Sequence, residues 1–594
     1  MCGIFGYSGN KKSKDTIFNG LKRLEYRGYD SWGIAILNEG KIYQYKNIGE
    51  IEKNEGLTKL HDGTIGIGHT RWATHGGVTT KNAHPHMSSD KKFSLVQNGI
   101  VENFDSLKKD LLKKGEKFIS QTDTEIIVKL IEKELLKKKI LRDAIITVFK
   151  QLEGRNTIAV LDSDSGKIYA IRNGSPLVIG VADDGTYLAS DTLSFSTATN
   201  KVILLDDYDM VEIEGKDIRR VNVMRNIKKD IDIKELKHQF SEIGKGKYDH
   251  FMIKEIVDQK KTILYATEYS KKDLQPLVDT IKKAKRVYTI GAGTAGFAAG
   301  QVAYFLRNIT KIDAQEVKSY EFKSYIPIIT KKDLVIAFSQ SGETADTIEA
   351  LEQLKKKGCK VASIVNMFGT TISRLSDYEY YTNSGPEICV ASTKVFTAQC
   401  AWGYLLAMSI AKRDKEAQSN IKKLSKELSK LFTEKVYAQT RSVGKIMKKQ
   451  EHAFILGKGE NSCIALEGAL KIKEISYKHV EGFAAGELKH GVIALIEKGT
   501  VVFGIIPEKK YTESNDLISA MEQVKARGAF TIGIGSKEFK ENKVFDMYIS
   551  VPQVGNISSI ANVIPFQLIS YFLSLELGNS IDKPRNLAKS VTVK

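Results

Sequence analysis

The chain begins MCGIFGY, so a cysteine directly follows the initiator methionine and a glycine follows the cysteine. Removal of Met1, which a small second residue favours, would leave Cys2 with a free α-amine whose pKa is ordinarily about 7.7–8.0. An amine that titrates near neutrality can act as general base for a thiol on its own residue. We therefore predict that Cys2 is an N-terminal nucleophile, with a cysteine placed there by chance as the alternative.

A second group of reactive residue types is the hydroxyl-rich stretch AFSQSGETADT at 337–347. Ser339, Ser341 and Thr344 come at the end of an apolar run and directly before a helical pattern. Hydroxyls together with free backbone N–H groups at a helix N-terminus form an anion site. The sequence predicts a phosphate site here, and a hydroxyl-rich helix cap is the alternative.

A third group lies in ALEGALKIKEISYKH at 465–479, whose apolar spacing predicts a helix. Glu467, Lys471 and Glu474 fall on one face of that helix, at spacings of four and three residues. Taken from the spacing alone, this face is interpreted as an exposed Glu–Lys stripe worth a few tenths of a kcal/mol, on the order of 0.2–0.5 kcal/mol per pair.

Length and composition describe a large globular chain. Its 594 residues should divide into about three or four units. The net charge of +19 arises from 90 Lys and Arg against 71 Asp and Glu, and much of it lies in scattered lysine runs that are typical of solvated helix faces. No stretch interleaves arginine with aromatic residues as a nucleic-acid platform would, so we expect neither a nucleic-acid nor a membrane partner.

The five cysteines are odd in number and show no CxxC spacing. This pattern favours reduced thiols over a disulfide framework or a zinc site. The N-terminus has no basic-then-apolar signal pattern, and the longest apolar run, at 400–411, is too short to span a bilayer. We expect a cytoplasmic protein.

Two different patterns divide the chain. Residues 2–240 show short alternating strands with Gly-rich turns, interrupted by helical periodicity in the segments at 123–138 and 141–152, which predicts antiparallel sheets packed with helices. A lysine-rich stretch without strong periodicity runs from about 225 to 250, and we place a linker at 241–249. Beyond it, strand–turn–helix alternation predicts parallel α/β architecture.

The second half contains an internal repeat. Apolar strands at 287–293 and 453–459 both end in Gly-x-Gly before a helix, and further strands follow at matched spacings, at 334–343 and 501–510 and then at 360–366 and 530–536. We predict two doubly wound α/β subdomains, 250–425 and 426–580, followed by a C-terminal tail, 581–594.

Six short motifs occur in the first half of the chain in this order: MCGIFGY, LEYRGYDSWGIA, GHTRWATHG, NAHPH, QNGIVEN and TDTE. Together they resemble the glutaminase domain of the N-terminal nucleophile amidotransferases. The resemblance implies a four-layer αββα fold in which Cys2 attacks the carboxamide of glutamine, forms a thioester and releases ammonia. It also implies an oxyanion hole made by Asn98 and Gly99, and glutamine-binding residues at Arg71, Trp72, His75, His84 and Asp123. Local sequence alone favours a turn for Asn98–Gly99 and an N-cap for Asp123.

In the second half, SQSGET resembles the phosphate cradle of sugar isomerase (SIS) domains. With EGFAAGELKHGVIAL and the tail KPRNLAKSVTVK, the whole chain resembles the family of isomerising glutamine–fructose-6-phosphate aminotransferases. The resemblance implies binding of fructose-6-phosphate, with the sugar-phosphate residues Thr294, Ser339, Gln340, Ser341, Thr344, Val390, Ala391, Ser392 and Ala588. It places ring opening on His490, a Schiff base on Lys589, proton transfer on Glu474, an assisting charge on Lys471 and the gate of an ammonia channel on Trp72.

The same resemblance implies no metal and no organic cofactor, and a homodimer in which His490 acts across the interface. Ala295 and Gly296 depart from the family pattern, in which Ser-Tyr is usual, and a sugar-contacting hydroxyl is thus absent. The alternative that stays open is an amidotransferase for a different keto-sugar or ketose phosphate. A non-catalytic sugar-phosphate sensor built on SIS domains would have no use for the full set of predicted catalytic residues, and the glutaminase half argues against a deaminase of amino-sugar phosphates as the main role.

Overall fold

The structure is a computed structural model that describes residues 2–236 and 244–591. It divides into two compact units: unit 1 is Met1–Ile243 with Ser590–Lys594, and unit 2 is Gly244–Lys589. Three residues of the predicted linker, 241–243, lie outside the described residues, as do Met1 and the last three residues of the predicted tail. The first helix of unit 2, α6, begins at Phe251.

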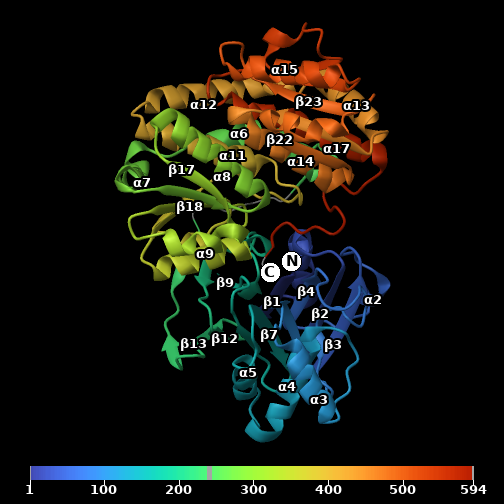
Figure 1. The fold of residues 1–594 in the computed structure, drawn as a ribbon. Coiled ribbons are helices and arrows are strands. Elements are labelled where there is room, and N and C mark those ends of the chain that lie inside the picture. The colour runs from blue at the N-terminus through green and yellow to red at the C-terminus, as the bar shows by residue number, and fades with distance from the viewer. Residues whose placement is uncertain (1, 237–243, 592–594) are drawn as a thin grey trace. The chain divides into compact units, whose positions relative to one another are not determined.

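Unit 1 contains two antiparallel sheets (Figure 1). The eight-stranded sheet has the order β15 (Ile233–Glu235), β11 (Lys201–Leu204), β9 (Val178–Ala182), β10 (Gly185–Ala189), β1 (Gly3–Gly9), β4 (Ile65–Arg71), β2 (Ser31–Asn38) and β3 (Lys41–Ile48). The seven-stranded sheet has the order β14 (Ile227–Lys229), β13 (Asp217–Asn222), β12 (Asp209–Glu214), β8 (Ile168–Ile171), β7 (Asn156–Asp162), β6 (Phe93–Gly99) and β5 (His86–Met87). The short strands β14 and β15 occupy part of the lysine-rich stretch at 225–250.

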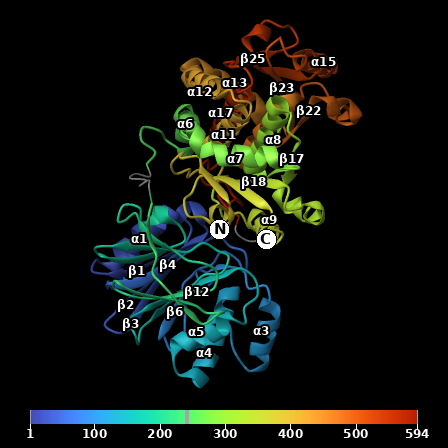
Figure 2. The ribbon, with the colours of Figure 1, turned by 90° about the vertical axis from the view of Figure 1, so that its left-hand side faces the viewer.

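Helices cover the outer faces of both sheets, as the succession of α1, the two sheets, and α4 with α5 in Figure 2 shows. Residues of β1, β2 and β4 pack against residues of β6, β7 and β12 between the sheets. Ile17 and Leu21 of α1 (Ser13–Leu24) pack on the eight-stranded sheet, and α4 (Asp123–Lys138) and α5 (Leu141–Phe149) pack on the seven-stranded one. The predicted four-layer αββα arrangement is confirmed. Shorter helices are α2 (Glu55–Thr58), α3 (Phe104–Lys113), η1 (Glu25–Arg27) and η2 (Thr192–Ser194).

Unit 2 contains two five-stranded parallel sheets with matching strand order. The first runs β17 (Ala314–Lys318), β16 (Val287–Gly291), β18 (Leu334–Ser339), β19 (Lys360–Val365) and β20 (Tyr378–Tyr381). The second runs β22 (His479–Ala484), β21 (His452–Gly457), β23 (Val501–Ile506), β24 (Phe530–Gly535) and β25 (Met547–Ser550). The internal repeat and the two doubly wound subdomains are therefore confirmed.

Helices flank both sheets of unit 2 (Figures 1 and 2). They are α6 (Phe251–Tyr265), α7 (Lys271–Lys283), α8 (Gly293–Phe305), α9 (Ala345–Lys356), α10 (Thr371–Leu375), α11 (Lys394–Ile410), α12 (Asp414–Leu428), α13 (Glu434–Lys448), α14 (Ser462–Ser476), α15 (Glu513–Lys525), α16 (Ser558–Asn562) and α17 (Ile564–Leu577). The 3₁₀ or π turns are η3 (Leu306–Thr310), η4 (Ser319–Ser324), η5 (Ile326–Ile328), η6 (Ser429–Leu431), η7 (Gly459–Asn461), η8 (Ala485–His490), η9 (Val492–Leu495) and η10 (Lys537–Phe539).

The apolar segment Gly555–Leu577 is long enough to cross a membrane by length and composition, but most of it is buried inside unit 2. This is the pattern of a core helix. Because the first sheet reverses its winding between β16 and β18, the carboxyl ends of these two strands are where an open α/β sheet binds its ligand. Unit 2 is thus built to hold a small molecule beside Ser339, the last residue of β18.

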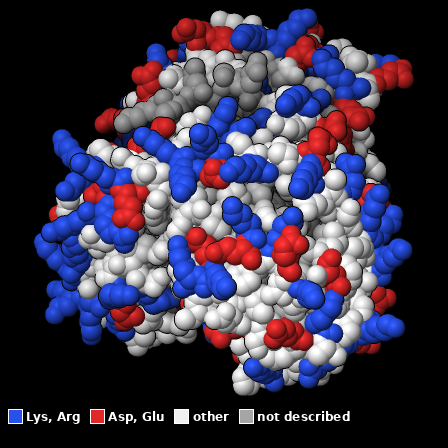
Figure 3. Space-filling view, turned by 90° about the horizontal axis from the view of Figure 1, so that it is seen from above, with Lys and Arg blue, Asp and Glu red and all other residues white. Residues whose placement is uncertain are grey.

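Charged side chains of both signs lie on the face of the molecule drawn in Figure 3. On the face drawn in Figure 3, lysine and arginine side chains are interspersed with acidic and uncharged ones. This distribution fits the interpretation of the lysine runs as solvated helix faces. All five cysteines are free thiols.

Candidate active sites

Cys2 directly precedes β1, and the antiparallel pairing of β1 with β4 brings it beside Arg71 and Trp72. The backbone N–H of Trp72 donates to Cys2 Sγ at 3.4 Å, and the thiol reaches the Trp72 carbonyl oxygen at 3.6 Å. Burial raises the pKa of the Cys2 thiol, while the Trp72 N–H and the positive charge of Arg71 act in the opposite direction and Asp123 raises it further. The structure therefore brings Arg71, Trp72 and Asp123 together around the predicted nucleophile.

Asn98 and Gly99 end strand β6, so the turn favoured by local sequence is wrong. His69 Nε2 lies 2.9 Å from the Gln97 carbonyl oxygen and 3.1 Å from Asn98 Oδ1. Since a carbonyl only accepts, Nε2 carries the proton and the Asn98 oxygen faces His69. Asn98 Nδ2 donates one N–H to Ser190 Oγ at 2.8 Å. The second N–H of that amide is then available to an oxyanion.

Gly99 cannot be replaced in this geometry. Its φ is +117°, and a Cβ would lie 1.8 Å from the Arg155 carbonyl oxygen. Only glycine lets the strand continue past Asn98 with this backbone orientation. The backbone thus supports the predicted pairing of a side-chain amide with a backbone N–H.

We expect Asn98→Ala to lower kcat for glutamine hydrolysis by about 10²–10³, because one oxyanion donor is lost. KM should change little, since the donor acts on the charge that develops during attack rather than on bound glutamine. Steady-state glutaminase kinetics measure both values, with Asn38→Ala at the end of β2 as the control. A loss confined to KM would assign Asn98 to ground-state binding instead.

The residues predicted to bind glutamine surround the same strand ends. The Arg71 guanidinium donates to the carbonyl oxygens of His75, Gly76 and Gly77 at 2.5, 3.1 and 3.2 Å. Asp123 is the first residue of α4, but its Oδ2 accepts from the Val101 backbone N–H at 2.9 Å, so its carboxylate does not cap its own helix. A guanidinium and a carboxylate near one nucleophile are suited to the α-carboxylate and α-amine of an amino acid.

Three buried histidines lie next to one another beside this site, the first pair of rings stacked and the second edge-on. The rings of His69 and His84 are 4.2 Å apart and those of His84 and His86 are 5.0 Å apart. Thr124 and Thr122 hydroxyls lie 3.0 Å from Nε2 of His84 and His86. Burial lowers the pKa of His69 to about 3 and holds the pKa values of the other two well below the usual range. Sequence reasoning selected His84 and missed His69 and His86, although GHTRWATHG and NAHPH contain them.

These histidines predict a loss of stability in acid. Each stays neutral in the folded state while its unfolded pKa is about 6.5, so the unfolded state binds more protons as the pH falls below that value. The free energy of unfolding should fall by up to about 1.4 kcal/mol per pH unit for each histidine between pH 6.5 and 4. Urea unfolding should show a shallower slope for His84→Gln and an unchanged one for the exposed His61→Gln. Equal slopes for all three proteins would contradict the prediction.

In unit 2, the hydroxyl-rich stretch forms a pre-built loop between β18 and α9. Ser339 Oγ accepts from the Gly342 N–H at 2.9 Å and lies 3.0 Å from Thr344 Oγ1. Ser341 Oγ accepts from the Glu343 N–H at 3.2 Å. Thr344 directly precedes α9, yet its side chain makes no cap hydrogen bond with that helix. The loop therefore presents hydroxyls at the carboxyl end of β18, and Gln340 lies within it.

The face of α14 that carries Glu467 and Lys471 is buried, so the prediction of an exposed Glu–Lys stripe is wrong. The side chains of Lys471 and Glu467 are fully buried, and Lys471 Nζ lies 2.5 Å from Glu474 Oε2 and 3.4 Å from Glu467 Oε1. Lys471 also donates to Thr294 Oγ1 at 3.0 Å. Burial raises the pKa of Glu467 to about 8, whereas the two carboxylates outweigh burial and raise the pKa of Lys471. Lys471 is thus held as an ammonium ion, and burial favours the protonated form of Glu467.

The tail brings Lys589 into this unit rather than leaving it frayed. Its side chain is 1% exposed, and Nζ lies 2.6 Å from Glu387 Oε2 and 2.7 Å from the Cys389 carbonyl oxygen. The Ser392 hydroxyl donates to the same Glu387 oxygen at 2.7 Å. Glu387 also acts electrostatically on Lys471, so the α14 face and Lys589 belong to one region. Glu387 was missed by sequence reasoning, although GPEICVASTK contains it directly before the selected residues.

Three of the remaining residues predicted to bind the sugar phosphate are apolar. Val390 and Ala391 are buried beside Ser392, and the Val390 N–H donates to the Asp582 carbonyl oxygen at 3.1 Å. Ala588, in the C-terminal tail, is half-buried. His490 is exposed at the end of η8, which follows the edge strand β22 of the second sheet, and no contact in the described residues joins it to Lys589. Ala295 and Gly296 lie in the first turn of α8, directly after Thr294.

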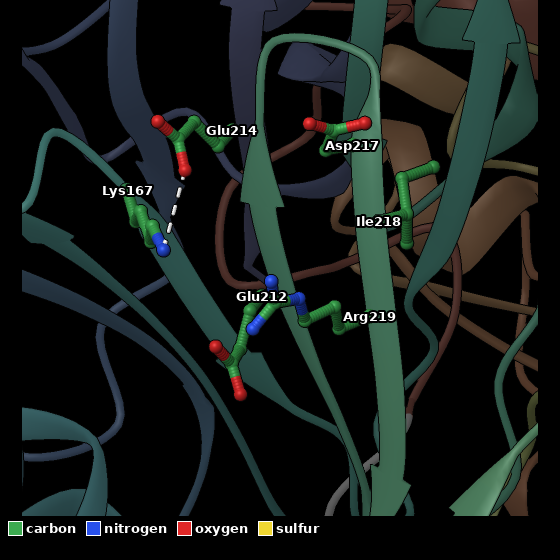
Figure 4. Close-up of a pocket in the computed structure, with 6 residues that line it drawn as sticks. All are labelled: Lys167, Glu212, Glu214, Asp217, Ile218 and Arg219. Carbon is green, nitrogen blue, oxygen red and sulfur yellow. Dashed lines mark ion pairs between the residues drawn. The ribbon is translucent and has the colours of Figure 1, made fainter.

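A separate cavity of about 260 Å³ lies along the β12–β13 hairpin of unit 1 (Figure 4). Charged side chains line it, and Lys167 pairs with Glu214 at 3.2 Å. None of the predicted site residues lines this cavity. It is therefore distinct from the site around Cys2.

Family models match both halves of the chain. The family model described as a glutamine amidotransferase domain matches residues 69–197, and the SIS domain model matches residues 280–409 and 446–576. Relatives named glutamine–fructose-6-phosphate aminotransferase (isomerizing) are 41% identical in Pyrococcus horikoshii, 40% in Thermococcus kodakarensis and 38% in Clostridium acetobutylicum. Each alignment covers 100% of this chain and 100% of the relative.

Among solved structures, the C-terminal domain of glucosamine-fructose-6-phosphate aminotransferase from Francisella tularensis is similar to this chain with a TM-score of 0.52 and 27% identity. The match covers 57% of this chain and 100% of that chain.

Proposed function

Because the chain belongs to the family of isomerising glutamine–fructose-6-phosphate aminotransferases, we propose that it transfers the amide nitrogen of glutamine to fructose-6-phosphate and releases glucosamine-6-phosphate. Unit 1 supplies ammonia and unit 2 consumes it. The observation that carries the proposal is that residues suited to both reactions occur in one chain. Unit 1 has Cys2 beside Trp72 and Asn98 at the end of β6, and unit 2 has the buried Lys589–Glu387 pair, the Lys471–Glu474 pair of α14 and the Ser339 loop.

In unit 1, the freed α-amine of Cys2 takes the thiol proton and Sγ attacks the glutamine carboxamide carbon. The Asn98 side-chain N–H and the Gly99 backbone N–H stabilise the negative charge on the carboxamide oxygen. Arg71 binds the α-carboxylate and Asp123 binds the α-amine. Ammonia leaves, and water then hydrolyses the thioester to glutamate.

In unit 2, the hydroxyls of Ser339, Ser341 and Thr344 hold the phosphate at the start of α9. His490 opens the sugar ring, and Lys589 forms a Schiff base with the C2 ketone. Ammonia replaces Lys589 at C2. Glu474 then moves a proton from C1 to C2, and the charge of Lys471 assists this transfer.

Four further features belong to the proposal. Trp72, beside Cys2, gates an internal channel for ammonia, and no metal or organic cofactor takes part. Two chains form a homodimer, and the exposed position of His490 is compatible with action on the partner subunit's sugar. The enzyme works in the cytoplasm, where its five free thiols stay reduced.

The test is to supply glutamine labelled with ¹⁵N in the amide together with fructose-6-phosphate. Label should appear in glucosamine-6-phosphate, as read by mass spectrometry. Competing ketose phosphates test the second candidate substrate class, which the missing hydroxyl at Ala295 favours. Unlabelled product, or faster turnover of another ketose phosphate, would overturn the assignment of substrates.

A further inference from the structure

A buried carboxylate that none of the steps above uses lies against the reactive nitrogen of unit 2. We propose that Glu387 holds Lys589 as an ammonium ion in the resting enzyme and accepts its proton when the amine attacks the C2 ketone. This inference rests on the Schiff-base role proposed for Lys589.

Glu387 is fixed by the start of α11. Its Oε1 accepts from the backbone N–H groups of Thr393 and Val395 at 2.9 and 3.1 Å. Its Oε2 accepts from the Ser392 hydroxyl at 2.7 Å and from Lys589 Nζ at 2.6 Å. The side chain is 0% exposed. A carboxylate held by a helix N-terminus and two further donors has one orientation, and Oε2 is the oxygen that faces Lys589.

Two buried carboxyl groups, Glu255 and Glu387, lie in this region, and their protonation states differ. Burial and the charge of Glu387 raise the pKa of Glu255 to about 8, and its Oε1 accepts from the Ile388 N–H at 2.6 Å. Burial opposes ionisation of Glu387, but Lys589, Ser392 and the Thr393 N–H outweigh it and lower the pKa of Glu387. Near neutrality Glu255 is therefore protonated and Glu387 is ionised. The other titratable or charged groups acting on this cluster are Lys254 and Asp258 on α6, Lys394 on α11, Lys471 on α14, Cys389 before α11 and Asp582 in the tail.

An ammonium has no lone pair, so Lys589 must lose a proton before it attacks. Its Nζ has two close acceptors, the Cys389 carbonyl oxygen and Glu387 Oε2, and only the carboxylate can take a proton. The proton moves to Glu387, Nζ bonds to C2, and a second nitrogen proton passes to the former ketone oxygen. Glu387 then returns its proton to that hydroxyl, the C2–O bond breaks and water leaves. The products are a protonated Schiff base, water and an ionised Glu387, so no proton is gained or lost overall.

The test is borohydride trapping with fructose-6-phosphate, in which mass spectrometry follows the adduct on Lys589 between pH 5 and 9. We expect Glu387→Gln to slow trapping at pH 7 by about 10²-fold, since a general base is lost. The acid limb of the pH profile, where the trapping rate falls as the pH decreases, should also move to lower pH. The reason is that loss of the adjacent anion disfavours the ammonium form of Lys589. Glu387→Asp keeps a carboxylate and should recover part of the rate with the original acid limb.

Asp333→Asn is the matched control, because it removes another buried carboxylate of unit 2, which pairs with the half-buried Arg286 at 3.2 Å. It should leave trapping unchanged. Glu387→Gln with an unchanged rate, or with a lower rate but an unmoved acid limb, would overturn the inference in favour of a structural role. Failure of the unsubstituted enzyme to form any adduct would instead overturn the Schiff-base role, and so the proposed function of Lys589.

Discussion

We expect Cys2→Ala to abolish glutamine hydrolysis and glutamine-driven synthesis, with a loss of at least about a thousandfold in kcat. The reason is that the thioester cannot form without the thiol, and loss of a nucleophile removes most of the catalysis that the remaining groups support. Binding of fructose-6-phosphate should persist, because that site is built from residues of unit 2. Glutamate release and calorimetric sugar-phosphate binding measure the two properties on the same protein.

Cys359→Ser is the matched control for the thiol. Cys359 is buried directly before β19, and its Sγ donates to the Asp333 carbonyl oxygen at 3.2 Å, a bond that a serine hydroxyl can keep. This variant should retain glutaminase activity. Full activity of Cys2→Ala would remove the nucleophile assignment. Intact-mass analysis that found Met1 on the active enzyme would remove the role of the α-amine.

Lys589→Arg has the second largest expected effect, a loss of synthesis and of borohydride trapping by at least about a thousandfold. Arginine keeps a positive charge opposite Glu387, but a guanidinium stays protonated and does not form a Schiff base. Glutamine hydrolysis should continue, because Cys2 and Asn98 are untouched. Parallel assays of glutamate and glucosamine-6-phosphate on one sample measure the uncoupling.

Lys415→Arg, at an exposed position of α12, is the control and should leave both products unchanged. An adduct found on a different lysine in the unsubstituted enzyme, or synthesis retained by Lys589→Arg, would contradict the assignment. Loss of glutamate release as well would indicate that Lys589→Arg disturbs more than the sugar chemistry.

The sequence determined the elements and the repeat because these follow from local patterns. The segment at 123–138 carries continuous helical periodicity and forms α4 over those residues. Apolar runs that end in Gly-x-Gly at matched spacings became β16 and β21 in two sheets of the same order. The hypothesis that Cys2 is a nucleophile also came from the sequence, because Cys2 directly follows Met1 and precedes Gly3.

Only the tertiary structure decided which polar residues are buried and which of them meet. Asn98–Gly99 has the local pattern of a turn, yet the pairing of β6 with β7 and the contact with His69 make it the end of a strand. Lys471 has the spacing of an exposed stripe, yet the packing of α14 buries it completely. Lys589 stands five residues from the terminus but meets a carboxylate 202 residues earlier in the chain. Burial and charge pairing depend on segments that fold together from distant positions, and no local pattern records which segments those are.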